Sequence, residues 1–162
     1  MAGCSPNRFQ ELVEEHQADL YRLAYSYMKN RDDALDVVQE SILKGLSKLP
    51  TLRNEQSMRV WMTRIVVNES ISRLRRRRPD FSYQEWDGPA EPEQNRDELV
   101  DLRRSLDLLD PKLRTVVVLR FFEDMKLEDI AHVVRAPLST VKSRLYRALA
   151  QLRVDLEQKE DL

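Results

Sequence analysis

The sequence predicts an all-α protein built from two small helical domains joined by a flexible, acidic linker. Of its 162 residues, 34% are charged and only three are glycine, a composition that favours exposed helices over turn-rich sheets. Apolar residues recur at helical spacing over most of the chain, and no segment shows the alternation or turn dipeptides of a β-hairpin. We expect domains at residues 1–78 and 98–162, with the linker at residues 79–97.

The first domain is expected to begin with a helix over residues 5–29. Ser5 and Pro6 are a typical helix start, because serine accepts a hydrogen bond from an unpaired amide and proline fits the first turn. A second helix is expected from the capping pair Asp32 and Asp33 up to the proline at position 50. Its apolar stripe should comprise Leu35, Val38, Ile42, Leu46 and Leu49.

A third helix is expected over residues 57–78, before Pro79. Its apolar residues fall on two nearly opposite sides of a helical wheel, so its two halves should face different partners. Between these patches lies a polar strip that comprises Arg64, Asn68, Ser72 and Arg75. Residues 51–78 hold eight arginines against two glutamates, a net charge of +6, which exceeds what is needed to oppose the helix dipole.

The charge then changes sign along the chain. Residues 79–97 hold six acids and one arginine, a net charge of −5, together with three prolines and a glycine. This composition is typical of a linker. Residues 130–154 contain five basic residues and no acid. Two basic surfaces separated by an acidic tether are the main functional feature of the sequence.

The second domain should contain helices over residues 97–109, 110–123 and 127–134, and a last helix from Leu138 or Ser139 to beyond residue 154. Asp110 and Pro111 supply a cap and a first turn. In the first two helices, the residues expected to point inward are Leu99, Leu102, Leu106, Leu109, Val116, Val117, Leu119 and Phe122. The last two helices are joined by a tight turn and the second is the more basic, which is typical of a helix-turn-helix.

The last helix has one apolar and one polar face. The apolar face comprises Val141, Leu145, Ala148, Leu149 and Leu152. Opposite and flanking it stand Thr140, Lys142, Ser143, Arg144, Arg147, Gln151 and Arg153. Arginine offers a planar fork to guanine or phosphate, and hydroxyl groups reach phosphates or base edges, so this face suits the major groove of DNA. An amphipathic surface helix without DNA contacts has a similar wheel.

Several classes of function are disfavoured. One cysteine and two histidines exclude an internal disulfide and leave no plausible zinc cluster. No phosphate-binding glycine loop and no nucleophile with an adjacent base is present, so we expect no enzyme, no cofactor, no metal and no small-molecule substrate. The chain has no apolar run of membrane-spanning length and no signal segment, so we expect it to be cytoplasmic.

Four segments resemble those of the extracytoplasmic-function (ECF, group 4) sigma factors of the sigma-70 family. They are DALDVVQE at residues 33–40, WMTRIVVN at 61–68, LEDIA at 127–131 and TVKSRLYRA at 140–148. The resemblance covers about residues 7–78 and 98–155. It implies a sigma-two and a sigma-four domain without a third domain between them, and a protein that binds core RNA polymerase and directs promoter-specific transcription initiation.

The same resemblance implies three sets of site residues. Those that would dock on the β′ clamp helices of core polymerase are Asp33, Asp36, Gln39, Glu40 and Lys44. Those near the minus-ten element would be Asn54 and Gln56, in the loop that captures a flipped base, and Trp61, Arg64, Asn68, Arg73 and Arg76. Those that would contact the minus-thirty-five element are Thr140, Lys142, Ser143, Arg144 and Arg147. For Trp61, packing inside the domain is the alternative.

Four residues depart from the family pattern near the helix-turn-helix. Arg135 stands where many members have glycine, and Lys126 where serine or threonine often caps a helix. Leu138 and Ser139 replace a frequent glutamate and a frequent glycine. We expect Arg135 and Lys126 to be tolerated, and the details of base readout to differ from the pattern.

The resemblance also implies regulation and further partners. Family members are usually inhibited by an anti-sigma factor, commonly membrane-anchored, and the β flap of polymerase is a second docking site. A role in a stress response is the physiology that this implies. Two other classes stay open from the residues alone: a helix-turn-helix operator-binding regulator that acts without core polymerase, and a helical adaptor whose basic faces meet acidic partners.

Overall fold

The computed structural model describes residues 4–76 and 104–160, with side chains up to residue 153. The chain forms two compact units, and the described parts of both are helical and contain no strand. The predicted all-α class with two helical domains is thereby confirmed. The predicted linker and the first part of the helix predicted at residues 97–109, including Leu99 and Leu102, lie outside the described residues.

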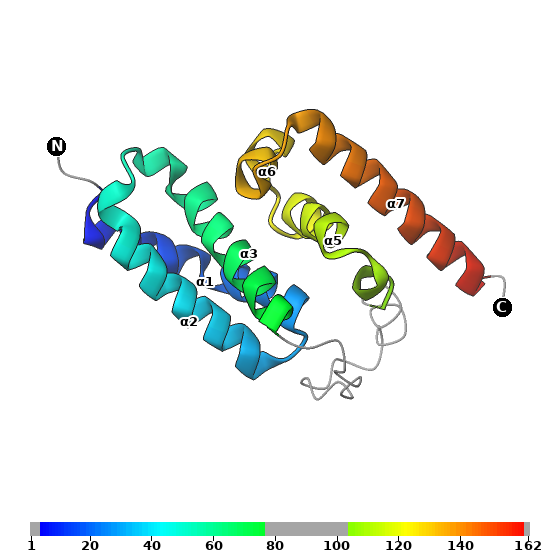
Figure 1. Cartoon of the computed structure of the whole chain (residues 1–162), viewed down its shortest axis with the longest axis horizontal. Coiled ribbons are helices and arrows are strands. Elements are labelled where there is room, and N and C mark those ends of the chain that lie inside the picture. Colours follow the sequence, from blue (N-terminus) through cyan, green and yellow to red (C-terminus); the bar gives the residue numbers. More distant parts are fainter. Residues whose placement is uncertain (1–3, 77–103, 161–162) are drawn as a thin grey trace. The chain divides into compact units, whose positions relative to one another are not determined.

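The N-terminal unit is a bundle of three helices that pack pairwise against one another (Figure 1). They are α1 (Pro6–Met28), α2 (Arg31–Lys48) and α3 (Met58–Arg76). The 3-10 turns η1 (Leu49–Thr51) and η2 (Glu55–Ser57) connect α2 to α3. Its most completely buried apolar side chains are Leu23, Ala24, Tyr27, Ala34, Val37, Met58, Met62 and Val66.

The start of α1 agrees with the sequence prediction, whereas the start of α2 does not. Ser5 Oγ accepts a hydrogen bond from the Arg8 amide at 3.2 Å. For α2 the cap is Asn30, not Asp32 or Asp33, and its side-chain oxygen accepts from the Asp33 amide at 2.9 Å. The helix begins two residues earlier than expected because an asparagine at N-cap satisfies the amides of the first turn as well as an aspartate does.

The apolar stripe predicted for α2 is partly wrong. Leu35 is 39% and Leu46 is 48% exposed, while the buried face comprises Ala34, Val37, Val38, Ser41 and Gly45. The helix is thus turned so that its small residues, rather than its leucines, contact α1 and α3. The fit on this side is tight, because even a Cβ at Gly45 would lie only 3.0 Å from Phe9 Cζ.

The prediction that α3 faces different partners on two sides is also revised. Its buried line follows four-residue steps through Met58, Met62, Val66 and Ser70. Trp61, Ile65, Val60, Ile71 and Leu74 are only half-buried. One side of α3 therefore faces the bundle along its whole length, and this side includes the polar residue Ser70 and the carboxyl group of Glu69, which is 3% exposed.

The C-terminal unit is built around α5 (Pro111–Val117), α6 (Leu127–Val134) and α7 (Leu138–Glu160). The predicted cap is confirmed, since Asp110 Oδ1 accepts from the Lys112 amide at 3.0 Å. A cluster of buried residues joins α5 to α7: Leu109, Leu113, Val117, Ala148 and Leu152. Leu109, Val116, Val117 and Leu119 are buried as predicted, and Leu106 packs partly buried against the cluster.

Phe122 does not point inward as predicted. It is 43% exposed and its neighbour Phe121 is 57% exposed. The reason lies in the backbone, because α5 continues into a π-helical turn, η4 (Val118–Phe122). A π turn contains more residues than an α turn, so it rotates the side chains that follow relative to an α-helical wheel.

The turn between α6 and α7 has the backbone geometry of a glycine position but carries Arg135. Its φ and ψ angles are 54° and 50°, in the left-handed region. The Arg135 amide donates to the Ala131 carbonyl, as does the amide of Ala136 at 3.1 Å. Lys126, before α6, makes no side-chain capping bond. Both departures from the family pattern are therefore accommodated at some cost in stability.

Gly45→Ala is expected to destabilise the protein by about 1 kcal/mol. A Cβ at this position would lie 3.0 Å from Phe9 Cζ and 3.1 Å from Met62 Sδ, and both neighbours are buried. Overpacking costs about 1–3 kcal/mol, and the helix propensity of alanine offsets about 1 kcal/mol of it. Urea denaturation followed by circular dichroism measures the change. Ser47→Ala, at an exposed site of the same helix, is the control and should be neutral or stabilising; equal effects of both would contradict the packing argument.

Arg135→Gly is expected to raise the free energy of unfolding by about 0.5–1 kcal/mol. A side chain in the left-handed region costs about 1–2 kcal/mol, part of which is cancelled by the greater freedom of glycine in the unfolded chain. Thermal unfolding measures the gain. Arg135→Ala removes the same charge but keeps Cβ, so it should give no gain; a gain of the same size in both variants would assign the effect to charge.

Candidate nucleic-acid interface

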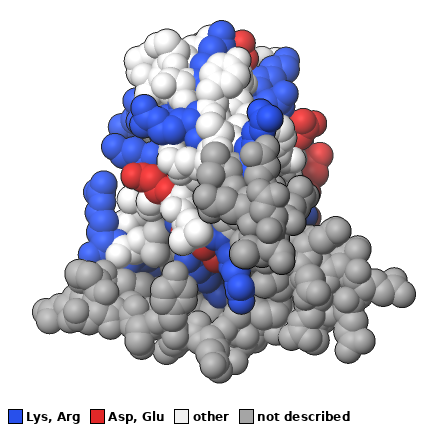
Figure 2. Space-filling model, turned by 90° about the vertical axis from the view of Figure 1, so that its right-hand side faces the viewer, with Lys and Arg blue, Asp and Glu red and all other residues white. Residues whose placement is uncertain are grey.

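The exposed face of α7 carries the residues predicted for the minus-thirty-five contact. Val141, Leu145, Ala148 and Leu152 are buried as predicted, whereas Leu149 is 38% exposed. On the opposite side Lys142, Ser143 and Arg147 are exposed, and Thr140 and Arg144 are half-buried. Viewed from the side on which α7 lies in Figure 1, blue Lys and Arg side chains predominate over acidic ones on the described surface (Figure 2). The helix is thus anchored on one side and cationic on the other.

Tyr146 is a member of this face that the sequence reading omitted. Its side chain is 70% exposed, and it lies one helical turn beyond Lys142 and beside Arg147. The wheel contained the signal, because position 146 falls on a side of the helix that points away from the buried stripe. We use the term recognition face for Thr140, Lys142, Ser143, Arg144, Tyr146 and Arg147.

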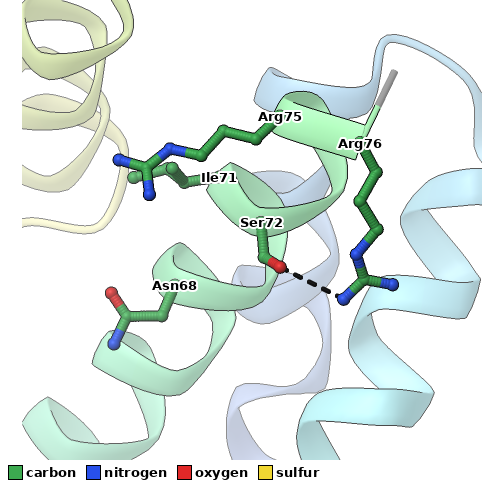
Figure 3. Close-up of a pocket in the computed structure, with 5 residues that line it drawn as sticks. All are labelled: Asn68, Ile71, Ser72, Arg75 and Arg76. Carbon is green, nitrogen blue, oxygen red and sulfur yellow. Dashed lines mark hydrogen bonds between the residues drawn. The ribbon is translucent and has the colours of Figure 1, made fainter. Parts of the chain in front are cut away.

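The polar strip of α3 is present in the structure and borders a hollow. Asn68, Ile71, Ser72, Arg75 and Arg76 line this hollow. In Figure 3, Asn68, Ile71 and Arg75 extend from one side of α3, whereas Arg76 turns toward Ser72, where its guanidinium donates to Ser72 Oγ at 3.1 Å. Arg75 is exposed and lines the hollow together with Arg76, although only Arg73 and Arg76 of these three arginines are among the predicted site residues.

Arg73 lies on a different side of α3 from the polar strip. Its Nε donates to Glu69 Oε1 at 3.4 Å, and its guanidinium lies 3.9 Å from Asp36 Oδ2 on α2. The side chain is 26% exposed. The structure therefore does not bring Arg73 together with Arg64, Asn68 and Arg75.

Glu69 is the buried anion of an ion-pair network between α2 and α3. Lys44 on α2 donates to Glu69 Oε2, and Arg73 contacts the other oxygen. Burial acts to raise the pKa of the Glu69 carboxyl, but hydrogen bonds and charge from Lys44 and then Arg73 outweigh it, so the pKa lies below its ordinary value of 4.5. The sequence reading counted Glu69 only as a charge opposing the arginines and missed this role.

The loop predicted to capture a base is held by its own capping bond. The Asn54 side-chain oxygen accepts from the Gln56 amide at 3.0 Å, and Gln56 is exposed. Leu52 is buried and its carbonyl accepts from the Cys4 amide at 3.3 Å. Trp61 makes an edge-to-face contact with Phe9, with ring centroids 6.4 Å apart. This contact supports packing of Trp61 in the domain.

The exposed side of α2 is less charged and more apolar than predicted. Asp36 and Gln39 are exposed, but so are Leu35, Leu43 and Leu46, and we call these five residues the docking face. Leu43 is the most exposed of the three leucines, at 62%. Three apolar side chains around an acid and an amide are typical of a surface that a partner covers.

The other residues predicted for polymerase docking have partners within the bundle or lie at its edge. Asp33 accepts from Asn30 Nδ2 at 2.7 Å, which completes the cap of α2. Lys44 pairs with Glu69, and Glu40 is half-buried.

Over the described residues, no group of three or more His, Cys, Asp or Glu side chains is placed to hold a metal ion. None of the helices described has an apolar stretch sufficient to cross a membrane.

Comparison with known proteins identifies both units. Residues 12–79 match sigma-70 region 2, and residues 99–152 match sigma-70 region 4. The RNA polymerase sigma factor SigV of Bacillus subtilis (strain 168) is 44% identical over 154 residues, which are 93% of this chain and 91% of that protein. The ECF RNA polymerase sigma factor SigW of the same organism is 26% identical over 168 residues, which are 91% and 88% of the two chains.

Two solved structures have the same fold. The sigma factor RpoE in complex with the anti-sigma factor NepR from Bartonella quintana aligns with a TM-score of 0.79 at 24% identity, over 92% of this chain and 96% of that one. CnrH in complex with the cytosolic domain of CnrY aligns with a TM-score of 0.74 at 27% identity, over 93% and 88%.

The chain therefore belongs to the extracytoplasmic-function sigma factors of the sigma-70 family. It is an alternative sigma factor that binds core RNA polymerase and promoter DNA and directs transcription initiation, and proteins of this family are not enzymes. The predicted family and function are confirmed, and the alternatives of an operator-binding regulator or an adaptor are not supported.

Glu69→Gln is expected to lower the free energy of unfolding by about 1–2 kcal/mol at pH 7, the value of a charged hydrogen bond discounted for partly exposed partners. Because the folded-state pKa of Glu69 lies below its ordinary value, the stabilisation is complete above about pH 4.5 and is lost as the pH falls through the folded-state pKa. Urea denaturation from pH 7 to pH 3 should show the two proteins converging. A stability difference that stays constant down to pH 3 would contradict the ionised state of Glu69.

Proposed function

We propose that this sigma factor divides its work among three helices: α2 docks on polymerase, α3 holds the melted minus-ten strand and α7 reads the minus-thirty-five element. The observation that carries the proposal is that each helix buries one face in its own unit and exposes a second, chemically distinct face. The proposed domains are residues 1–78 and 98–162, with residues 79–97 as the tether that lets both units reach their DNA elements.

For docking, we propose that the β′ clamp helices of polymerase cover the docking face of α2. Burial of Leu35, Leu43 and Leu46 would supply affinity, and Asp36 and Gln39 would supply orientation against a basic partner surface. Asp33, Glu40 and Lys44 flank this face. Asp33 and Lys44 support it through their contacts with Asn30 and Glu69. The exposed pair Phe121 and Phe122 on η4 offers the C-terminal unit an apolar surface for the β flap.

For promoter melting, we propose that Arg64, Asn68, Arg75 and Arg76 follow the phosphates of the open strand. A row of cations and amides on one helix attracts a single strand without regard to sequence. Base choice would then fall to the neighbouring loop of Asn54 and Gln56. The contact between Trp61 and Phe9 fixes the start of α3 beside this loop.

For the upstream element, we propose that the recognition face of α7 enters the major groove. Arg147 and Lys142 would contact guanine edges or phosphates, and Thr140 and Ser143 would contact phosphates. Arg144 lies at the edge of this face, and the exposed ring of Tyr146 would add apolar contact with thymine methyl groups or sugars.

We further propose regulation by an anti-sigma factor. RpoE and CnrH were each solved with a partner, the anti-sigma factor NepR and the cytosolic domain of CnrY, and the docking face of this chain has the apolar character that such a partner would mask. We also propose that this anti-sigma factor is membrane-anchored and that a stress response releases the sigma factor from it. The released sigma factor would act in the cytoplasm.

Arg147→Ala is expected to reduce initiation at promoters with a matched minus-thirty-five element by about tenfold, because a specific base contact is worth about 1–3 kcal/mol. In vitro transcription from a promoter library with core polymerase measures this and reveals the promoter sequences. Lys112→Ala removes one charge at an exposed site of the same unit and should leave the sequence profile unchanged.

Two results would contradict the proposal. One is transcription that starts equally well without the protein. The other is an Arg147→Ala profile in which the minus-thirty-five preference is unchanged.

A further inference from the structure

Arg73 contacts acids of both α2 and α3. Its guanidinium lies between Glu69 on its own helix and Asp36 on α2. Arg75 and Arg76, two and three residues further on, are exposed. A side chain with the same charge as its neighbours is thus turned away from the surface that would carry the DNA strand.

The contacts of Arg73 are longer than the contact between Lys44 and Glu69. Glu69 is neutralised by Lys44 at close range, whereas Arg73 reaches it only at 3.4 Å. If Arg73 leaves, the buried carboxylate keeps one cation and one hydrogen-bonding partner, so no unpaired buried charge results. Moving Arg73 away from Glu69 therefore costs less free energy than moving Lys44 away.

The outer contact of Arg73 lies on the docking face. Asp36 is 61% exposed and its Oδ2 lies 3.9 Å from the Arg73 guanidinium. An ion pair this long and this exposed changes an equilibrium by no more than about fivefold. A cation of a partner protein that approaches Asp36 in a drier interface would compete with it effectively.

We propose that Asp36 and Glu69 are positioning residues that hold Arg73 away from nucleic acid in the free protein, and that a cationic group of polymerase bound at Asp36 releases Arg73 to a phosphate of the promoter strand. The inference rests on the proposed roles of α2 and α3. It couples polymerase docking to strand binding, and because such coupling is reciprocal, a bound strand in turn strengthens docking at Asp36.

The test compares two arginine variants in two states of the protein. Binding of a fluorescent single-stranded oligonucleotide, carrying a minus-ten sequence found by the transcription assay, is measured by anisotropy over a range of salt concentrations. Each phosphate contact to a single strand contributes about 0.7 to the slope of log K against log salt. Arg73→Gln should leave this slope unchanged in the free protein and reduce it by about 0.7 in the holoenzyme. Arg75→Gln, the control on the polar strip, should reduce it by about 0.7 in both states.

A second pair of variants tests the role of Asp36 in the free protein. Asp36→Asn should raise the affinity of the free protein for the oligonucleotide about three- to fivefold and increase the slope by about 0.7. This gain should vanish in the double variant Asp36→Asn with Arg73→Gln. Asp32→Asn removes the same charge from an exposed site of the same helix, so it measures the effect of charge alone and should give a smaller gain that Arg73→Gln does not abolish.

Three results would overturn the inference. Arg73→Gln could reduce the slope in the free protein as much as Arg75→Gln does, which would mean that Arg73 is not withheld. It could leave the slope unchanged in both states, which would mean that Arg73 never reaches a phosphate. Asp36→Asn could behave like Asp32→Asn. Failure of the proposed function is distinct from all three, because then the wild-type holoenzyme starts no defined transcripts or Arg75→Gln is without effect.

Discussion

Close packing of α2 through small residues is the constraint on which the N-terminal unit depends. The small residues Ala34, Ser41 and Gly45 share the buried side of this helix with two valines. A single added methyl group at Gly45 would meet the ring of Phe9 and the sulfur of Met62. Because the small side is the one that fits, the leucines of α2 remain in solvent. The packing requirement in the core thereby leaves an apolar surface on the exposed side of α2. A large partner protein can cover this surface.

Helices α3 and α7 also bury one side and expose another, but their exposed sides carry charged residues rather than leucines. Each helix buries one side and exposes arginines on another, so most of the cations proposed to bind DNA lie outside the buried core. The exception is the network around Glu69, where the core and the binding surfaces share residues. Lys44 and Arg73 contact the buried Glu69 carboxylate, and Arg73 also pairs with Asp36. These three partners are at the same time parts of the proposed interfaces. A change at Glu69 is therefore expected to affect stability and binding together, whereas a change at the exposed Arg147 is expected to affect binding alone.

Much of this arrangement could be predicted from the sequence because local rules govern it. Ser5, Pro6, Asp110 and Pro111 set helix starts through hydrogen bonds within one turn, and the buried stripe of α7 follows from its period. The errors arose where the local signal was ambiguous or absent. Asn30 and the aspartates after it are equally good caps, and the choice between leucines and small residues on α2 depends on the shapes of α1 and α3. A π turn such as η4 has no sequence signature, and the contacts of Glu69 join residues 25 positions apart.

The capping bond of Asn54 has a consequence for the way a base can be read. To recognise adenine with two hydrogen bonds, an amide side chain must offer its oxygen to the exocyclic amino group and its NH2 to a ring nitrogen at once. The Asn54 oxygen already accepts from the backbone N–H of Gln56, which occupies one of its two lone pairs and fixes the direction of the amide group while the turn is intact. In the proposed readout, Gln56 would be the freer of the two amide side chains to turn both its oxygen and its NH2 toward an adenine, and the capping bond of Asn54 would fix where Gln56 lies.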